Sequence, residues 1–154
     1  MPKAQAAVID LFIALFLFMI MLSTTIYTWN LYITRLNEDR ENTEIIMKAF
    51  QATEALVKNE GIPANWNLTN VNLAGLGIDR ILFSDKVDLF FNLSEDKIKD
   101  IFKIQLYDFN ITLKYINGTK IKEKNNLEGE KYNNVKRYAL YKNEPAILEF
   151  KIGK

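Results

Sequence analysis

The chain has 154 residues, with 20 basic and 19 acidic side chains and neither cysteine nor histidine. The net charge of +1 argues against a general nucleic-acid binder, because such proteins carry a strongly basic surface. The two missing residue types exclude thiol nucleophiles, disulfides, histidine acid–base pairs and zinc sites of the usual kind, and the length suggests one domain with an apolar segment at one end.

The apolar segment contains 24 consecutive residues without a charge, from Leu11 to Thr34. At about 1.5 Å per residue, a helix of that length covers about 36 Å, enough to cross a hydrocarbon core of about 30 Å. No small-residue cleavage site follows Leu22, so we expect the segment to stay in the mature protein and not to be removed as a secretory signal. One carboxylate, Asp10, stands immediately before the run.

Charges on the two sides of this run predict its orientation. Lys3 and the chain amine precede it, whereas two arginines and four acidic residues follow it between Arg35 and Glu44. The positive-inside rule then places the N-terminus in the cytoplasm and everything after Arg35 outside. Residues 35–100 are mainly acidic and residues 101–154 mainly basic, which fits either solvated faces or complementary surfaces between identical subunits.

A single helix is predicted over residues 5–60, with at most a bend in the β-branched and aromatic run at 23–29. Glycine and proline, the main helix breakers, are absent from Lys3 to Glu60 and reappear at Gly61 and Pro63. The first half is apolar all round. In the second half, spacing of three to four predicts a buried stripe that consists of Leu36, Ile46 or Met47, Phe50, Thr53 and Val57.

The rest of the chain predicts a small α+β head. Ser84 and Ser94 are the expected N-caps of two short helices, each with acidic residues in its first turn. The polar stretch 122–134 is an expected exposed loop between two strand pairs. The first pair turns at Asn117-Gly118, the favoured two-residue hairpin turn. The alternating residues expected on the apolar face are Phe109, Ile111, Leu113 and Tyr115 in the first pair, and Ala146, Leu148, Phe150 and Ile152 in the second. We therefore expect a four-stranded antiparallel sheet packed on the helix stripe.

Four sites match the N-x-[ST] rule for N-glycosylation, at Asn67, Asn92, Asn110 and Asn117. Chance predicts roughly one match in a chain with this asparagine content, and all four lie on the side predicted to be outside. The alternative is an asparagine-rich sequence that matches by accident. Asn117 also has a role in its turn, and Asn110 is predicted to lie within a strand.

No catalytic, cofactor or metal-binding pattern is recognisable in the sequence. The glycines of LAGLG at 73–77 lack the lysine and the helix of a phosphate-binding loop. Trp66 is either a binding aromatic or, as we expect, a cover for the helix stripe. We therefore expect neither an enzyme nor a cofactor.

Several of these features together resemble an archaeal type IV pilin-like protein with a class III, prepilin-type signal. The resemblance rests on KAQAAVID at 3–10, GIPANWN at 61–67 and YKNEPAILEFKI at 141–152. It implies a lollipop-like fold with a leader at 1–4, a transmembrane or filament-core half-helix at 5–34 and an extracellular head at 35–154. A prepilin peptidase would cut between Ala4 and Gln5. The family usually has glycine where this chain has Ala4, and often a carboxylate at mature position five, where Asp10 would be sixth.

The resemblance also implies a filament subunit, a major or minor pilin that waits in membrane lipid and then assembles with copies of itself or other pilins into a surface filament. Asp10 would pair with the new amine on Gln5 of a neighbour; alternatively it only touches the interfacial layer. The rival hypothesis is a membrane-anchored extracellular binding or adhesion protein that never polymerises. The residues expected to bind neighbouring subunits are Asp10, Leu11, Phe12, Phe16, Phe18 and Ile20.

Overall fold

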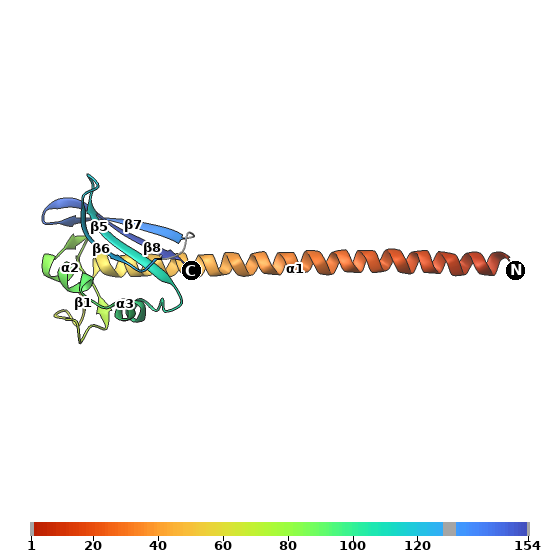
Figure 1. Cartoon of the computed structure of the whole chain (residues 1–154), viewed down its shortest axis with the longest axis horizontal. Helices are drawn as coiled ribbons and strands as arrows, with labels where there is room; N and C mark the ends of the chain where they lie inside the picture. The colour runs from red at the N-terminus through yellow and green to blue at the C-terminus, as the bar shows by residue number, and fades with distance from the viewer. Residues whose placement is uncertain (1, 128–131, 154) are drawn as a thin grey trace. The chain divides into compact units, whose positions relative to one another are not determined.

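The computed structural model describes residues 2–127 and 132–153, with side chains described from Val8 onward. Its first element is one uninterrupted helix, α1 (Pro2–Lys58), drawn as a single coil in Figure 1. The predicted continuous helix is therefore confirmed, and it ends three residues before Gly61, which has a φ of 94°. The chain divides into two units, residues 1–42 and residues 43–154.

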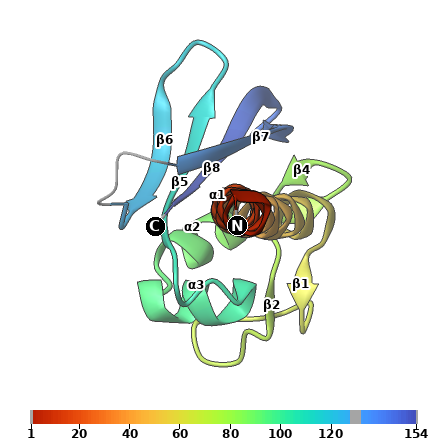
Figure 2. The ribbon, with the colours of Figure 1, turned by 90° about the vertical axis from the view of Figure 1, so that its right-hand side faces the viewer.

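The first unit consists of α1 alone, and the second has an α+β fold. Its helices and strands, after the last turns of α1, are β1 (Gly61–Ile62), β2 (Leu73–Ala74), β3 (Gly77–Ile78), β4 (Ile81–Leu82), α2 (Ser84–Phe91), α3 (Glu95–Phe102), β5 (Asp108–Tyr115), β6 (Lys120–Asn125), β7 (Tyr132–Tyr141) and β8 (Glu144–Gly153). Within the second unit, Figure 2 shows the large sheet on one side of the last turns of α1 and α3 on the other. These last turns of α1, from residue 43 to 58, thus lie at the centre of a layered head.

The large sheet has six strands in the order β3-β4-β7-β8-β5-β6, where four were predicted. The four long strands are the predicted ones, and all their pairings are antiparallel. The two additional strands have two residues each, and β4 runs parallel to β7. A two-residue strand carries too little alternation to be read from sequence, because only its long-range partner defines it.

The polar stretch 122–134 is only partly a loop. Residues 122–125 belong to β6, which pairs with β5, and residues 132–134 begin β7. Residues 128–131 lie outside the described part of the chain. The lysine-rich sequence of β6 is typical of an edge strand, where charged side chains discourage pairing with another chain.

The buried face of α1 differs from the predicted stripe. Thr53 and Val57 are buried as expected, whereas the predicted large residues are exposed by 42–53%, namely Leu36, Ile46, Met47 and Phe50. The face that packs in the head is Ile45, Ala49, Ala52, Thr53 and Leu56. Two alanines on this face are small, so the larger side chains of the sheet and of α2 fill the space beside them in the core.

Only one of the two predicted N-caps is confirmed. The Ser94 side chain accepts a hydrogen bond from the backbone N–H of Lys97 at the start of α3. Ser84 instead occupies the first helical position of α2, whose N-cap is Phe83 and lacks a side-chain cap bond.

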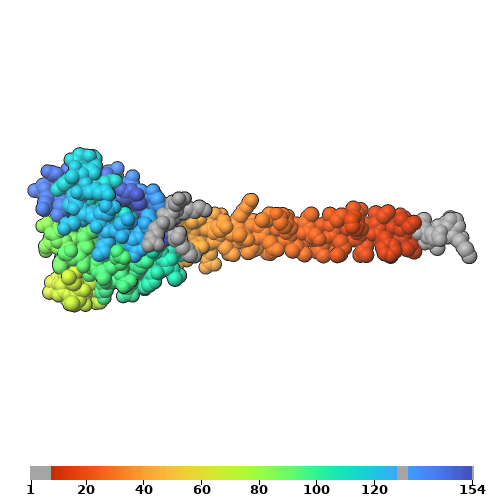
Figure 3. Space-filling model, viewed as in Figure 1, coloured from red at the N-terminus to blue at the C-terminus, as the bar shows by residue number. Residues whose placement is uncertain are grey.

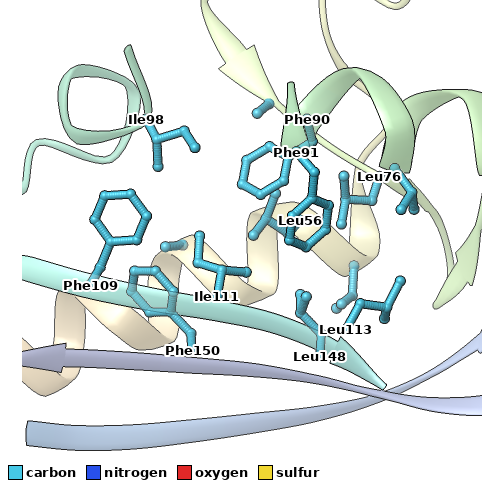
Figure 4. Packing of buried hydrophobic residues seen from close by; sticks show 14 of the residues in the cluster. Leu56, Leu76, Phe90, Phe91, Ile98, Phe109, Ile111, Leu113, Leu148 and Phe150 are labelled. Atoms are coloured by element: carbon cyan, nitrogen blue, oxygen red, sulfur yellow. The ribbon is translucent and has the colours of Figure 1, made fainter. Parts of the chain in front are cut away.

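The core of the head lies between the sheet, α1 and α2 (Figure 4). Leu56 of α1 is fully buried, as are the predicted rows of β5 and β8 apart from Tyr115, which is half-buried. Trp66 is 1% exposed, and its indole N–H lies 2.8 Å from the carbonyl oxygen of Glu60 and 3.3 Å from that of Gly75. Trp66 is therefore a buried core side chain fixed to the segments after α1, and its role as a cover for the helix stripe stays a prediction.

Candidate functional site: an exposed apolar helix

The first half of α1 exposes apolar side chains in every direction. Between Val8 and Leu36 the large apolar side chains retain 38–69% of their accessible surface; Figure 3 shows one face of this surface. This apolar surface is far larger than the contiguous apolar patch of a few hundred Å² that a soluble monomer typically exposes. The five apolar residues predicted for assembly all lie on it, exposed by 45–69%: Leu11, Phe12, Phe16, Phe18 and Ile20.

This half-helix is a candidate membrane span. Within Val8–Lys58 the helix is long and apolar enough to cross a membrane, and the apolar window has no buried residue. A signal sequence near an N-terminus passes the same test of length and composition. The finding therefore defines a segment suited to an apolar environment, and it defines no topology.

The charged end of the segment is Asp10, which is exposed between Ile9 and Leu11. Among the residues whose side chains the structure describes, Asp10 has no ion pair. A carboxylate on an apolar helix needs water, headgroups or a cation from outside the chain, because burying an unpaired charge is costly. Ala4 and Gln5 lie in the first turns of α1, but their side chains are outside the described set, so the predicted cleavage stays a prediction.

Polar and aromatic residues are concentrated at the other end of the segment. Each of four threonine hydroxyls donates a hydrogen bond to a main-chain carbonyl one turn earlier, at 2.8–3.0 Å, namely Thr24, Thr25, Thr28 and Thr34. Three aromatic side chains with polar atoms lie among them, exposed by 56–66%: Tyr27, Trp29 and Tyr32. The run at 23–29 predicted only a possible bend, although tryptophan and tyrosine at the end of an apolar run are the usual sequence signal of a membrane interface.

Three of the four sequon asparagines are exposed in the head: Asn67, Asn92 and Asn117. The Asn67 side-chain oxygen accepts hydrogen bonds from the backbone N–H and the hydroxyl of Thr69, at 2.9 and 2.8 Å. That of Asn117 accepts one from the Thr119 N–H at 2.9 Å. In these two turns the asparagine amide nitrogen stays at the surface.

Asn110 differs from the other three because both ends of its amide are engaged inside the sheet. Its Nδ2 donates to a Glu123 carboxylate oxygen at 3.0 Å, and its Oδ1 accepts from the Thr112 hydroxyl at 2.8 Å. Its backbone pairs on both sides, with Asn125 and Lys151. An enzyme that needs the amide nitrogen and an extended peptide would have to open the sheet to reach this sequon.

An apolar row crosses the solvent face of the sheet at one end. Ile78, Ile81, Leu140 and Pro145 are consecutive cross-strand neighbours on β3, β4, β7 and β8, and all four are exposed. Tyr138, two residues before Leu140 and hence on the same face, is 65% exposed. A shallow depression lies beside Tyr138, Leu140 and Pro145. This surface was not predicted, because its members come from strands too short to be recognised.

The described residues contain no group of three or more acidic side chains placed to hold a metal ion. Comparisons with protein families, with curated proteins and with solved structures find no match to this chain. Four features of the molecule therefore bear on its function: the apolar half-helix, Asp10, the exposed sequons and the apolar row.

Proposed function

We propose that this chain is a structural subunit of an archaeal type IV pilus-like surface filament, as a major or minor pilin. The observation that carries the proposal is the single helix with two environments. Its first half exposes apolar side chains all round, and one face of its last turns, from Ile45 to Val57, is buried in an α+β head. A helix that is apolar on every side suits lipid before assembly and a bundle of like helices afterwards.

In this proposal a prepilin peptidase removes residues 1–4 and leaves a cationic amine on Gln5. When the half-helices of several subunits pack together, that amine and Asp10 both leave water. The carboxylate of one subunit then neutralises the amine of its neighbour. Removing one partner from such a buried pair costs about 3–5 kcal/mol, because the other charge stays uncompensated.

The experiment is to express the full chain in an archaeal host that assembles such filaments and to purify the surface fraction. We expect a mature N-terminus at Gln5 by mass spectrometry and fibres by electron microscopy. Asp10→Ala should abolish fibres while cleavage and membrane levels stay normal, and Asp10→Glu, which keeps the charge, should restore them. Fibres of normal number from Asp10→Ala would refute the pairing, and an intact Met1 on a chain that never forms fibres would refute the pilin.

The alternative is a membrane-anchored extracellular protein whose head binds a ligand without polymerising. The apolar row on the sheet favours this alternative, since an exposed group of four apolar side chains on a folded head is a binding surface in its own right. Under this alternative, Leu140→Ser reduces binding to a cell surface while the protein remains monomeric with an intact N-terminus. Under the filament proposal, the same variant is found in fibres or disturbs their packing.

A further inference from the structure

We propose that a lipid bilayer covers α1 between Asp10 and a ring of three aromatics, Tyr27, Trp29 and Tyr32, here called the aromatic ring. Asp10 would lie in one headgroup layer and the aromatic ring in the other. The inference rests on the membrane stage of the proposed function, and it is independent of whether the subunit later polymerises.

The helix between Asp10 and the aromatic ring has about the length of a hydrocarbon core. The uncharged run of 24 residues would cover about 36 Å, which is longer than a hydrocarbon core of about 30 Å. At the average tilt of about 20° the run still spans about 34 Å, so part of it lies outside the core. Asp10 and Trp29 are separated by about 28 Å along the helix at 1.5 Å per residue, so a core bounded by these two residues has the required thickness.

The polar residues of the run all lie in its C-terminal half. From Leu11 to Leu22 every side chain is apolar, whereas serine, threonine and asparagine occur from Ser23 onward. The excess length therefore lies at the C-terminal end of the run. Tryptophan and tyrosine are enriched where the hydrocarbon core meets the headgroups, because their rings are apolar and their N–H or O–H groups need polar partners.

The threonines that precede the aromatic ring can lie in the apolar layer. The hydroxyls of Thr24, Thr25 and Thr28 already donate to carbonyl oxygens of the same helix. A hydroxyl that is hydrogen-bonded within the helix loses little when water is removed around it. These threonines are therefore compatible with the edge of the hydrocarbon core.

The positions of the three aromatics around the helix distinguish lipid from a protein that contacts one face. At about 100° per residue, Tyr27 lies about 200° around the helix from Trp29, and Tyr32 lies about 60° from Trp29. All three are exposed by more than half. Polar aromatics that surround a helix at one level fit a headgroup layer, which meets the helix from all sides, better than a neighbouring protein, which contacts one face.

The test is depth-dependent quenching of Trp29 fluorescence in the full chain. The protein is reconstituted into phosphatidylcholine vesicles brominated either near the top or near the end of the acyl chains. Trp66 is the only other tryptophan and is 1% exposed, so Trp29→Phe supplies its signal for subtraction. We expect stronger quenching of Trp29 by the shallow bromines. The matched control, Phe18→Trp in the Trp29→Phe background, should be quenched more strongly by the deep bromines.

A second measurement uses the absence of native cysteines. A membrane-impermeant maleimide should label Asn37→Cys in intact vesicles or after permeabilisation, and should leave Phe18→Cys unlabelled in both cases. Deep quenching of Trp29, labelling of Phe18→Cys, or failure of the protein to float with vesicles would overturn the inference. Because fibres play no part in these assays, a chain that inserts as described but never forms fibres refutes the filament and leaves this inference standing.

Discussion

The guanidinium of Arg137 on β7 stacks over the ring of Phe50 on α1, with its central carbon 4.0 Å from the ring centroid. Its Nη2 lies 3.5 Å from a Glu54 carboxylate oxygen, close enough for an ion pair. Neither this nitrogen nor Nε makes a hydrogen bond to any described residue, although both are buried. This contact explains how Phe50 can be 47% exposed and still link helix to sheet. Arg137 covers one face of the ring, and the other face is open.

We predict that Arg137 and Phe50 are energetically coupled. Urea unfolding of the full chain in detergent micelles, for Arg137→Met, Phe50→Leu and the double variant, should give a coupling free energy of about 1 kcal/mol. Lys48 lies over Tyr107 instead, so Lys48→Met combined with Phe50→Leu is the additive control. Additivity in both pairs would mean that the stacking has no net effect on stability.

The two serines expected as caps should differ in their effect on stability. Ser94→Ala removes a side-chain acceptor of the Lys97 N–H and should lower the free energy of unfolding by about 1 kcal/mol. Ser84→Ala lies inside the first turn of α2 and removes no cap bond, so it should have little effect. Equal losses from both variants in thermal unfolding would contradict this assignment.

Acid should weaken the head through Glu149 on the solvent face of β8. Burial by itself would raise the pKa of Glu149, but hydrogen bonds from Lys114 and Asn134, with the charges of Lys114 and Lys136, hold the pKa below its ordinary value. The stabilisation is therefore present above the pKa of the unfolded chain, about 4.3, and is lost as the pH falls through the lower folded value.

The corresponding measurement is the free energy of unfolding between neutral pH and about pH 3, compared with Glu149→Gln. We expect the variant to be less stable at neutral pH and to lose less stability in acid. Glu144→Gln changes an exposed glutamate of the same strand and should retain the acid dependence of the original chain. A steep acid loss that persists in Glu149→Gln would assign it to another group.

Two glycines should respond differently to alanine. A Cβ on Gly75 would overlap the main chain at Asn59 and Gly61, where the loop after α1 passes, so we expect Gly75→Ala to prevent folding of the head. Gly118, in the hairpin turn, has a φ of 90° and open space around it. Gly118→Ala should therefore fold with a loss of about 1 kcal/mol from backbone strain alone. A native melting curve for Gly75→Ala would show that this loop can move.

Glycans should be present at Asn67, Asn92 or Asn117 and absent from Asn110. The first three are exposed, whereas the Asn110 amide is hydrogen-bonded within the sheet. Intact-mass and glycopeptide analysis of native protein, with single Asn→Gln variants, measures the occupancy. A glycan on Asn110 would mean that the modification precedes folding, and an unmodified mass would reduce the four sequons to coincidence.

Much of the secondary structure was predictable because its signals are local. A run of 58 residues without glycine or proline predicts one helix, and α1 is one helix. Alternation along β5 and β8 predicted their buried rows, since successive side chains on a strand point to opposite faces. Asn117-Gly118 predicted a turn at this place, because glycine adopts a positive φ at little cost. The turn is longer than the two residues expected, since the Gly118 N–H donates to the Tyr115 carbonyl oxygen and the Tyr115 N–H to that of Thr119. The uncharged run predicted a helix that exposes apolar side chains.

Other features depended on contacts between distant parts of the chain. Spacing alone could not distinguish a stripe through Ile46 and Phe50 from the neighbouring face through Ala49 and Ala52, because both repeat at helical intervals. The tertiary structure selected the alanine face, since its small side chains leave room for Phe109 and Phe150 in the core. Likewise β3 and β4 are strands only because β4 pairs with β7 in the sheet. The apolar row depends on the same pairing. Local sequence signals determined where the long helix and the long strands form, and packing across the head determined the short strands, which faces met and which were left exposed.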